Sequence, residues 1–270
     1  MDIYQKTIAF YQAVPTEKRR IGQSAFLRDI FAVKAGEGRP VGIAQYAIHG
    51  REYITTELAF THYQTGVSKG SVWIIPLVNP DGALLSQIGL QSVGKEGDKA
   101  RLLRWNGKED FSLWKANGRG VDLNVNFPAR WGQGARNIRR AGAENYIGEY
   151  PFSERETLAL KNFTEEIAPD YTVSYHTKGE EIYWCFDGSE DRYPRHLACA
   201  EALSKTTGYP LAFAKNSVGG YKDWCIQRFG IPSFTIEAGQ DCLSHPLGED
   251  AVEDIVKKNQ WALYELSKEF

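Results

Sequence analysis

The sequence predicts an α/β fold with a single domain, in which a mixed, mostly parallel and twisted sheet is flanked by helices. Short apolar runs alternate along the chain with longer amphipathic segments, which is the pattern of parallel strands connected by helices. No Pro- or Ser-rich linker and no abrupt change of composition divides the 270 residues. We therefore expect one domain that spans residues 1–270.

Four short apolar runs are the predicted strands, because each has the length of a buried strand and is bounded by turn residues. In chain order they cover residues 41–48, 71–78, 171–175 and 231–236. The second run ends in the turn Asn79-Pro80-Asp81-Gly82. The polar segment that follows it, residues 83–118, is expected to be mostly loop.

Helices are expected where apolar residues recur at helical spacing between and after these strands. They cover about residues 53–63, 153–167, 189–207 and 249–268. Ser153-Glu154-Arg155-Glu156 has the form of a capping box and would begin the second helix, which Pro169 ends. Gly208 closes the third helix.

The composition limits the possible classes of function. A net charge of −2 argues against a nucleic-acid binder that works through a basic surface. No stretch approaches the roughly 18 apolar residues of a membrane span, and the first residues lack the apolar segment of a signal peptide. The widely spaced Cys185, Cys199, Cys225 and Cys242 are expected to be thiols. We expect a cytoplasmic protein.

Chemically capable residues follow three of the four predicted strands. His49-Gly50-Arg51-Glu52 comes directly after the first strand, His176 after the third and Glu237 after the fourth. In open α/β sheets the site lies outside the carboxyl ends of the strands. One such histidine or glutamate is usually an ordinary loop residue, but their presence at three matching ends indicates a common site.

The residue types in this site point to zinc. A catalytic zinc is held by three nitrogen, sulfur or oxygen ligands from the protein and keeps an open position. We therefore expect His49, Glu52 and His176 to bind one Zn²⁺ per chain, with a water in the fourth position whose pKa the metal lowers. Glu237 is expected to be the general base that takes the proton of this water and passes it to the leaving amine.

Further motifs accompany these residues in a fixed order. They are Asn79-Pro80-Asp81-Gly82, Gly120-Val121-Asp122-Leu123-Asn124, and Gly219-Gly220 followed by Asp223-Trp224. Together with His49-x-x-Glu52, His176 and Glu237, this set resembles the zinc carboxypeptidases over about residues 21–247. Residues 114–124, 151–154 and 174–184 resemble, more narrowly, the bacterial branch that cleaves γ-D-glutamyl–meso-diaminopimelate bonds in cell-wall peptides.

The resemblance implies roles for four more residues, each with an ordinary alternative. Lys115 aligns with an arginine that steadies the carbonyl oxygen, and its ammonium could stabilise an oxyanion or be an exposed loop cation. Arg51 aligns with a residue that contacts substrate, or forms a surface ion pair. Asn124 could hydrogen-bond a substrate carboxylate or cap a turn. Tyr221 could line the substrate pocket or pack in the core.

Val125 departs from the family pattern. Digestive-type carboxypeptidases have an arginine here, which binds the terminal carboxylate of the substrate through a bidentate pair, whereas valine cannot bind a carboxylate. An exopeptidase for ordinary α-carboxylate termini is therefore not expected, and the diaminopimelate branch also tends to lack this arginine. The charged candidates for contacts with a diaminopimelate side chain are Lys178, Glu180, Glu181, Lys222, Asp223 and Arg130.

We therefore predict a zinc metallopeptidase that hydrolyses the γ-D-glutamyl–meso-diaminopimelate amide bond of peptidoglycan peptides. Two alternatives stay open. One is a general metallocarboxypeptidase or an amide deacylase that acts on another substrate. The other is a catalytically silent binding module with the same fold. The presence of Glu237 argues against the silent module, because a binding protein needs no general base.

Overall fold

Eight strands form one sheet in the computed structural model, which describes residues 1–186, 194–213 and 217–270. The strands are β1 (Lys18–Gln23), β2 (Asp29–Gly36), β3 (Val41–Tyr46), β4 (Ser71–Ile75), β5 (Tyr171–His176), β6 (Glu181–Tyr183), β7 (Leu211–Ala212) and β8 (Ser233–Glu237). Their order across the sheet is β1-β2-β4-β3-β5-β8-β6-β7. The predicted α/β fold with a mixed sheet is confirmed.

The four predicted strands are the central ones, β4, β3, β5 and β8, and they run parallel to one another. Nearly every residue in them is buried, which explains why each appears in the sequence as a continuous apolar run. The outer strands make the sheet mixed, since β1–β2, β2–β4 and β6–β8 pair antiparallel. These outer strands were not predicted.

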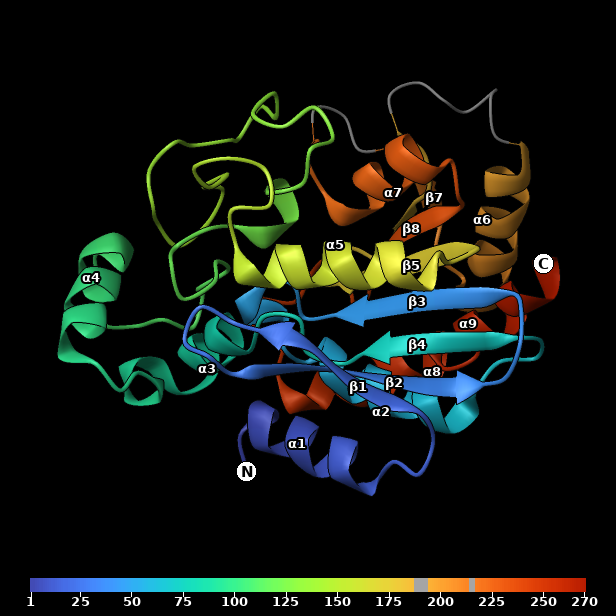
Figure 1. Cartoon of the computed structure of the whole chain (residues 1–270), viewed down its shortest axis with the longest axis horizontal. Helices are drawn as coiled ribbons and strands as arrows, with labels where there is room; N and C mark the ends of the chain where they lie inside the picture. The colour runs from blue at the N-terminus through green and yellow to red at the C-terminus, as the bar shows by residue number, and fades with distance from the viewer. Residues whose placement is uncertain (187–193, 214–216) are drawn as a thin grey trace.

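Helices cover both faces of the sheet (Figure 1). They are α1 (Ile3–Ala13), α2 (Thr55–Thr65), α3 (Pro80–Ile88), α4 (Glu96–Asn106), α5 (Arg155–Ile167), α6 (Pro194–Thr207), α7 (Tyr221–Phe229), α8 (Val252–Asn259) and α9 (Ala262–Leu266). Phe163 of α5 and Trp224 of α7 pack on one face of the sheet. Leu58 of α2 and Leu203 of α6 pack on the other, together with α8 and α9.

The expectation of a loop over residues 83–118 is wrong, because this segment contains most of α3 and all of α4. The Asn79 side chain accepts a hydrogen bond from the backbone N–H of Gly82 at 2.9 Å. With Pro80 in the first turn, the turn residues therefore begin a helix. In α4 the buried residue is Leu102, so the helix lacks the apolar stripe on which the prediction relied.

The other predicted helices form with changed details. Helix α5 begins close to where it was expected, but the predicted capping box is wrong. The Ser153 hydroxyl donates to the Glu154 carboxylate instead of accepting from the helix backbone. The Glu156 carboxylate accepts from the Ala25 backbone N–H at 2.9 Å. The C-terminal helix is divided into α8 and α9. Residues 189–193 of the third predicted helix lie outside the described residues.

Cys199, Cys225 and Cys242 carry thiols. Over the described ranges, the helices are too short or too polar to cross a bilayer.

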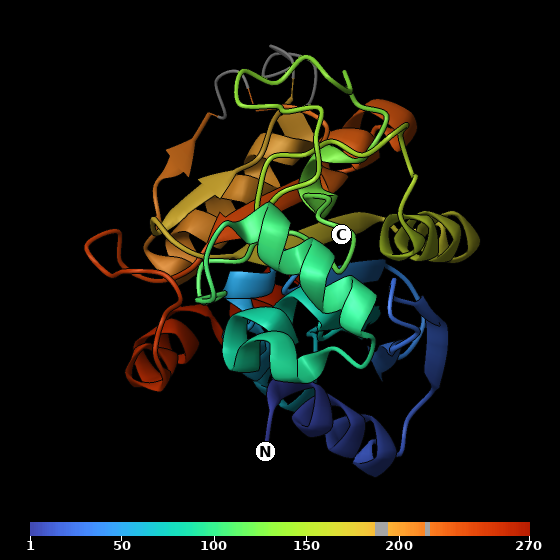
Figure 2. The same cartoon turned by 90° about the vertical axis from the view of Figure 1, so that its left-hand side faces the viewer.

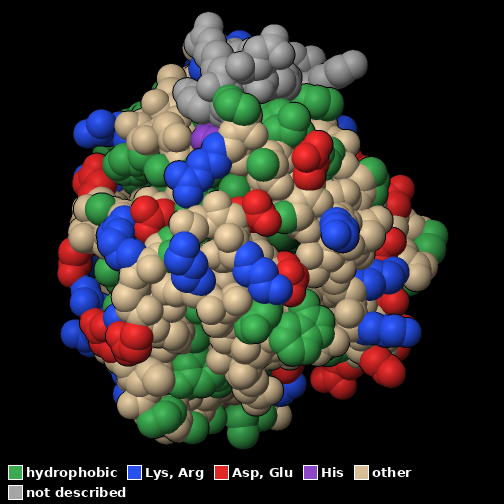
Figure 3. Space-filling view, turned by 90° about the vertical axis from the view of Figure 1, so that its right-hand side faces the viewer, with side chains coloured by type: hydrophobic (Ala, Val, Ile, Leu, Met, Phe, Trp, Pro, Cys, Tyr) green, Lys and Arg blue, Asp and Glu red, His purple; other side chains and the backbone are tan. Residues whose placement is uncertain are grey.

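The carboxyl ends of the parallel strands meet on one side of the molecule. The arrowheads of β3 and β4 point to this side in Figure 1, and Figure 2 looks at the molecule from it. In the register of the sheet, Tyr46 lies opposite Tyr175, and His176 lies opposite Glu237. The opposite side of the molecule has interspersed acidic and basic side chains (Figure 3), in keeping with a net charge near zero. The sheet therefore places the three strand ends of interest next to one another.

Candidate active site

The turn after β3 presents His49 and Glu52 on the same side of the backbone. Gly50–Glu52 forms one turn of 3₁₀-helix, a geometry that superimposes residues three apart. Its start is fixed from two directions: the Gly50 N–H donates to the Lys115 carbonyl at 2.9 Å, and a Cβ at Gly50 would lie 2.4 Å from the Gly82 carbonyl oxygen. This close packing requires glycine at position 50.

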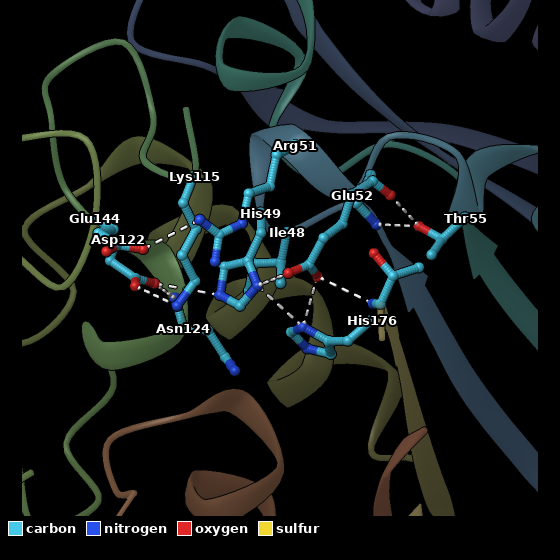
Figure 4. Close-up of polar contacts among 12 residues, drawn as sticks. Ile48, His49, Arg51, Glu52, Thr55, Lys115, Asp122, Asn124, Glu144 and His176 are labelled. Atoms are coloured by element: carbon cyan, nitrogen blue, oxygen red, sulfur yellow. Dashed lines mark hydrogen bonds and ion pairs between the residues drawn. The ribbon is translucent and has the colours of Figure 1, made fainter. Parts of the chain in front are cut away.

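His49, Glu52 and His176 converge, although His176 comes from a different strand (Figure 4). Nδ1 of His49 lies 2.9 Å from Glu52 Oε1, and Nδ1 of His176 lies 3.0 Å from Glu52 Oε2. The two Nδ1 atoms are 3.1 Å apart. All three side chains are buried.

This cluster fits a zinc ion. Protein ligands at about 2.0–2.2 Å from a tetrahedral zinc are about 3.3 Å from one another, close to the three distances above. Two imidazole nitrogens and a carboxylate are also the ligand types that zinc accepts. His49, Glu52 and His176, which the sequence predicted as ligands, can thus hold a metal together.

Asp122 connects the cluster to Lys115. One of its oxygens lies 3.3 Å from His49 Nε2, and the other lies 2.8 Å from Lys115 Nζ. Burial opposes the charge of Asp122, but Lys115 and His49 hold its pKa well below the usual range. A carboxylate behind a metal-binding histidine fixes the orientation of the ring. No role was predicted for Asp122 from the sequence, although it lies within the motif at residues 120–124.

Lys115 is a half-buried cation and not an exposed loop residue, with its side chain 17% exposed. Burial alone would lower its pKa, but the carboxylates of Asp122 and Glu52 outweigh burial and raise the pKa. The ammonium therefore stays charged at neutral pH and lines the cavity beside His49.

Glu237 lies at the end of β8 in a cavity of about 420 Å³ that it lines together with His49, His176 and Lys115. Burial raises the pKa of Glu237 to about 7; His176 opposes this rise and Glu52 adds to it. The carboxylate therefore faces the same space as the metal cluster and can exchange a proton near neutral pH.

Asn124 and Val125 also line this cavity. The Asn124 side-chain oxygen accepts from the Tyr221 backbone N–H at 3.1 Å, so Asn124 holds the start of α7 while it faces the cavity. The valine that replaces the family arginine lies in the cavity wall, where a substrate would contact it.

Arg51 and Tyr221 are bound elsewhere. Arg51 Nη1 forms an ion pair with Glu144 at 3.1 Å, the surface alternative considered for it. Tyr221 is fully buried, and its hydroxyl lies 2.8 Å from Thr164 Oγ1. The structure thus places this tyrosine in the core, the second of its two expected positions. A substrate contact by Arg51 stays a prediction.

Two of the six charged candidates for the diaminopimelate side chain, Lys222 and Asp223, line the cavity. They form an ion pair with each other at 2.6 Å. Lys178 forms an ion pair with Asp241 instead, and Glu180 forms one with Lys258. The sequence could name these residues but could not show which of them reach the cavity.

The sequence matches the zinc carboxypeptidase family over residues 4–247. The chain belongs to the zinc carboxypeptidase family. It therefore belongs to a family of metallopeptidases, and the predicted assignment to this family is confirmed. The matched residues include the whole metal cluster and Glu237.

Relatives of this zinc carboxypeptidase include a γ-D-glutamyl-L-diamino acid endopeptidase and a murein peptide amidase. It is 34% identical over 265 residues to a gamma-D-glutamyl-L-diamino acid endopeptidase 1 of Lysinibacillus sphaericus, covering 91% of this chain and 65% of the relative. The chain thus spans slightly less than two thirds of that relative's length. The resemblance to the narrower bacterial branch is supported by this match.

Two solved structures share the fold. Bovine thrombin-activatable fibrinolysis inhibitor has a TM-score of 0.77 at 18% identity and covers 99% of this chain and 96% of its own. The murein-tripeptide amidase of Escherichia coli O157 has a TM-score of 0.64 at 24% identity, and the match covers 96% of this chain and 95% of the amidase chain.

Proposed function

We propose that this zinc carboxypeptidase hydrolyses the γ-D-glutamyl–meso-diaminopimelate amide of peptidoglycan-derived peptides, with one Zn²⁺ per chain. The observation that carries the reaction class is the cluster of His49, Glu52 and His176 beside a cavity that Glu237 lines together with the two histidines. The substrate rests on the 34% identity to a γ-D-glutamyl-L-diamino acid endopeptidase and on Val125 in the cavity wall.

The metal would be held by His49, Glu52 and His176. When bound, zinc supplies Lewis acidity that polarises the scissile carbonyl and makes water a better nucleophile at neutral pH. Asp122 keeps the His49 ring in its ligand orientation through the 3.3 Å contact at Nε2.

Two side chains of the cavity carry out the remaining steps. Glu237, as a carboxylate, accepts a proton from the attacking water and delivers it to the leaving amine. The Lys115 ammonium stabilises the negative charge that develops on the carbonyl oxygen, and its 2.8 Å pair with Asp122 keeps it in place. Asn124 and Arg51 are proposed to contact the substrate.

A general metallocarboxypeptidase is disfavoured, because valine at position 125 provides no cation for an ordinary terminal carboxylate. A silent binding module is disfavoured, because Glu237 faces the metal cluster. We further propose a cytoplasmic location and one catalytic domain over residues 1–270. Cell fractionation tests the location, and limited proteolysis of the purified chain tests the domain.

The substrate proposal is tested by incubating the zinc-loaded protein with L-Ala-γ-D-Glu-meso-diaminopimelate and, separately, with an ordinary α-linked peptide. We expect cleavage of the first and little cleavage of the second. Cleavage of the ordinary peptide alone would overturn the substrate. A chain that binds zinc and cuts neither would instead be a binding module.

A further inference from the structure

Three cations line the cavity within the described part of the chain: Lys115, Arg136 and Lys222. Two of them are neutralised by carboxylates of the protein. Lys115 Nζ lies 2.8 Å from Asp122, and Lys222 Nζ lies 2.6 Å from Asp223. Lys222 also donates to the Cys185 carbonyl at 2.7 Å. Each of these two ammonium groups therefore already has a carboxylate partner in the protein.

Arg136 differs from both lysines. Its side chain is exposed at the cavity, and among residues 1–186, 194–213 and 217–270 it has no hydrogen-bond or ion-pair partner. A guanidinium presents a planar set of donors that matches a carboxylate in a bidentate pair. Arg136 thus brings an unpaired positive charge to the cavity wall.

The loop that carries Arg136 is held in place by backbone contacts. The Asn137 N–H donates to the Gly134 carbonyl at 3.1 Å, and the Ile138 N–H donates to the Asn145 carbonyl at 2.9 Å. Ile138 and Tyr146 form a β-bridge. The backbone on both sides of Arg136 is therefore ordered beside the cavity.

Asn137 supplies a second donor next to Arg136. It lines the same cavity, and its Nδ2 is buried without a hydrogen-bond partner in the described structure. A buried amide N–H₂ without a partner costs free energy unless a ligand accepts from it. A carboxylate oxygen at this place would satisfy Nδ2 while it pairs with Arg136.

We propose that Arg136, with Nδ2 of Asn137, binds a carboxylate of the diamino-acid residue of the substrate. The inference rests on the proposed function. Val125 lines this cavity at the position where the family arginine would bind the carboxylate of the terminal residue. The cavity therefore receives the residue that follows the scissile amide, and Arg136 provides from another loop the cation that position 125 lacks.

The test compares three variants in steady-state kinetics with L-Ala-γ-D-Glu-meso-diaminopimelate. Arg136→Gln should lower kcat/KM roughly 10- to 100-fold, mainly through KM, because a charge-assisted hydrogen-bonded pair is lost. Arg136→Lys should lose less, since it keeps the charge. Arg140→Gln is the matched control, because Arg140 is an exposed arginine on the same loop that does not line the cavity. It should stay within about twofold.

Substrates with one carboxyl group converted to a carboxamide identify the group that is bound. Amidation of one of the two diaminopimelate carboxyls should reduce kcat/KM of the wild type as strongly as Arg136→Gln does, and should not reduce that of the variant further. The proposal would be overturned if Arg136→Gln had wild-type kinetics. It would also be overturned if only amidation of the D-glutamyl carboxyl lowered kcat/KM. If the wild type does not cut the tripeptide at all, the proposed function fails, and this inference fails with it.

Discussion

Glu237 is the residue on which the proposed chemistry depends most. It lines the cavity beside His176 but is not needed as a ligand, because His49, Glu52 and His176 already form a cluster. Glu237→Gln should therefore lower kcat roughly 100- to 10,000-fold, the usual contribution of a general base, and leave zinc bound. Activity assays combined with metal analysis test this. An active variant, or one that has lost its zinc, would contradict the assigned role.

Asp122 should act on the metal through His49. Asp122→Asn weakens the contact to His49 Nε2 and releases Lys115. We expect zinc affinity to fall roughly 10- to 100-fold, as for other residues behind metal ligands, measured by competition with a chelator. The matched control is Asp223→Asn, since Asp223 is a buried carboxylate that also pairs with a cavity lysine. Equal zinc affinities in both variants would contradict the role of Asp122.

The sequence was sufficient to predict that His49, Glu52, His176 and Glu237 lie close together, because each lies at or just after the carboxyl end of a strand whose position in the sheet could be inferred. It was not sufficient for Asp122 or Arg136. Both lie in the long segment between α4 and α5, where contacts depend on the path of the loop and not on a periodic pattern. Tyr221 shows the same limit, since nothing in its local sequence distinguishes a core ring from a pocket ring.

At the level of elements, the start of α5 lies over a group of buried carboxylates. Glu156 accepts from the Ala25 N–H at 2.9 Å and from the Asn117 side chain at 3.2 Å. Burial, reinforced by Asp81, raises the pKa of Glu156 to about 8. The predicted capping box failed because this carboxyl group points into the protein and not back to its own helix.

This environment predicts that stability depends on pH. In the unfolded chain Glu156 loses its proton near its ordinary pKa of 4.5, whereas in the folded chain it keeps it until about pH 8. Unfolding therefore releases a proton between these values, and the free energy of unfolding should fall as pH rises, by at most about 1.4 kcal/mol per pH unit from this group. Below pH 4.5 Glu156 is protonated in both the folded and the unfolded chain, so its contribution to the free energy of unfolding is fully present and no longer changes with pH.

Urea unfolding between pH 5 and 8 in wild type and Glu156→Gln measures the effect. The variant, which cannot ionise, should lose less stability over this range. Glu149→Gln serves as the control, because Glu149 is exposed. A pH dependence in Glu156→Gln that equals that of the wild type would rule out a protonated Glu156 in the folded protein.

For the whole molecule, the central parallel strands could be predicted because burial on both faces leaves an apolar run in the sequence. The edge strands could not. β1 is half-buried and rich in charge, and β7 has two residues, so neither carries a clear pattern. Helix α4 was not predicted for a similar reason: it buries few apolar side chains, so its sequence has no clear apolar pattern.

Metal removal should affect both activity and stability. A ligand that binds only the folded chain stabilises it by mass action. Treatment with a chelator should therefore abolish hydrolysis and lower Tm, and added Zn²⁺ should restore both. Full activity in a preparation shown to be free of metal would refute the zinc assignment.

The proposed reaction is hydrolysis of a γ-D-glutamyl–diamino acid amide at the cavity where the three strand ends meet. Mass spectrometry of the products from L-Ala-γ-D-Glu-meso-diaminopimelate tests it most directly, with wild type and Glu237→Gln in parallel. We predict L-Ala-D-Glu and free diaminopimelate from the wild type and intact tripeptide from the variant. Intact tripeptide with the zinc-loaded wild type, or equal cleavage by the variant, would contradict the claim.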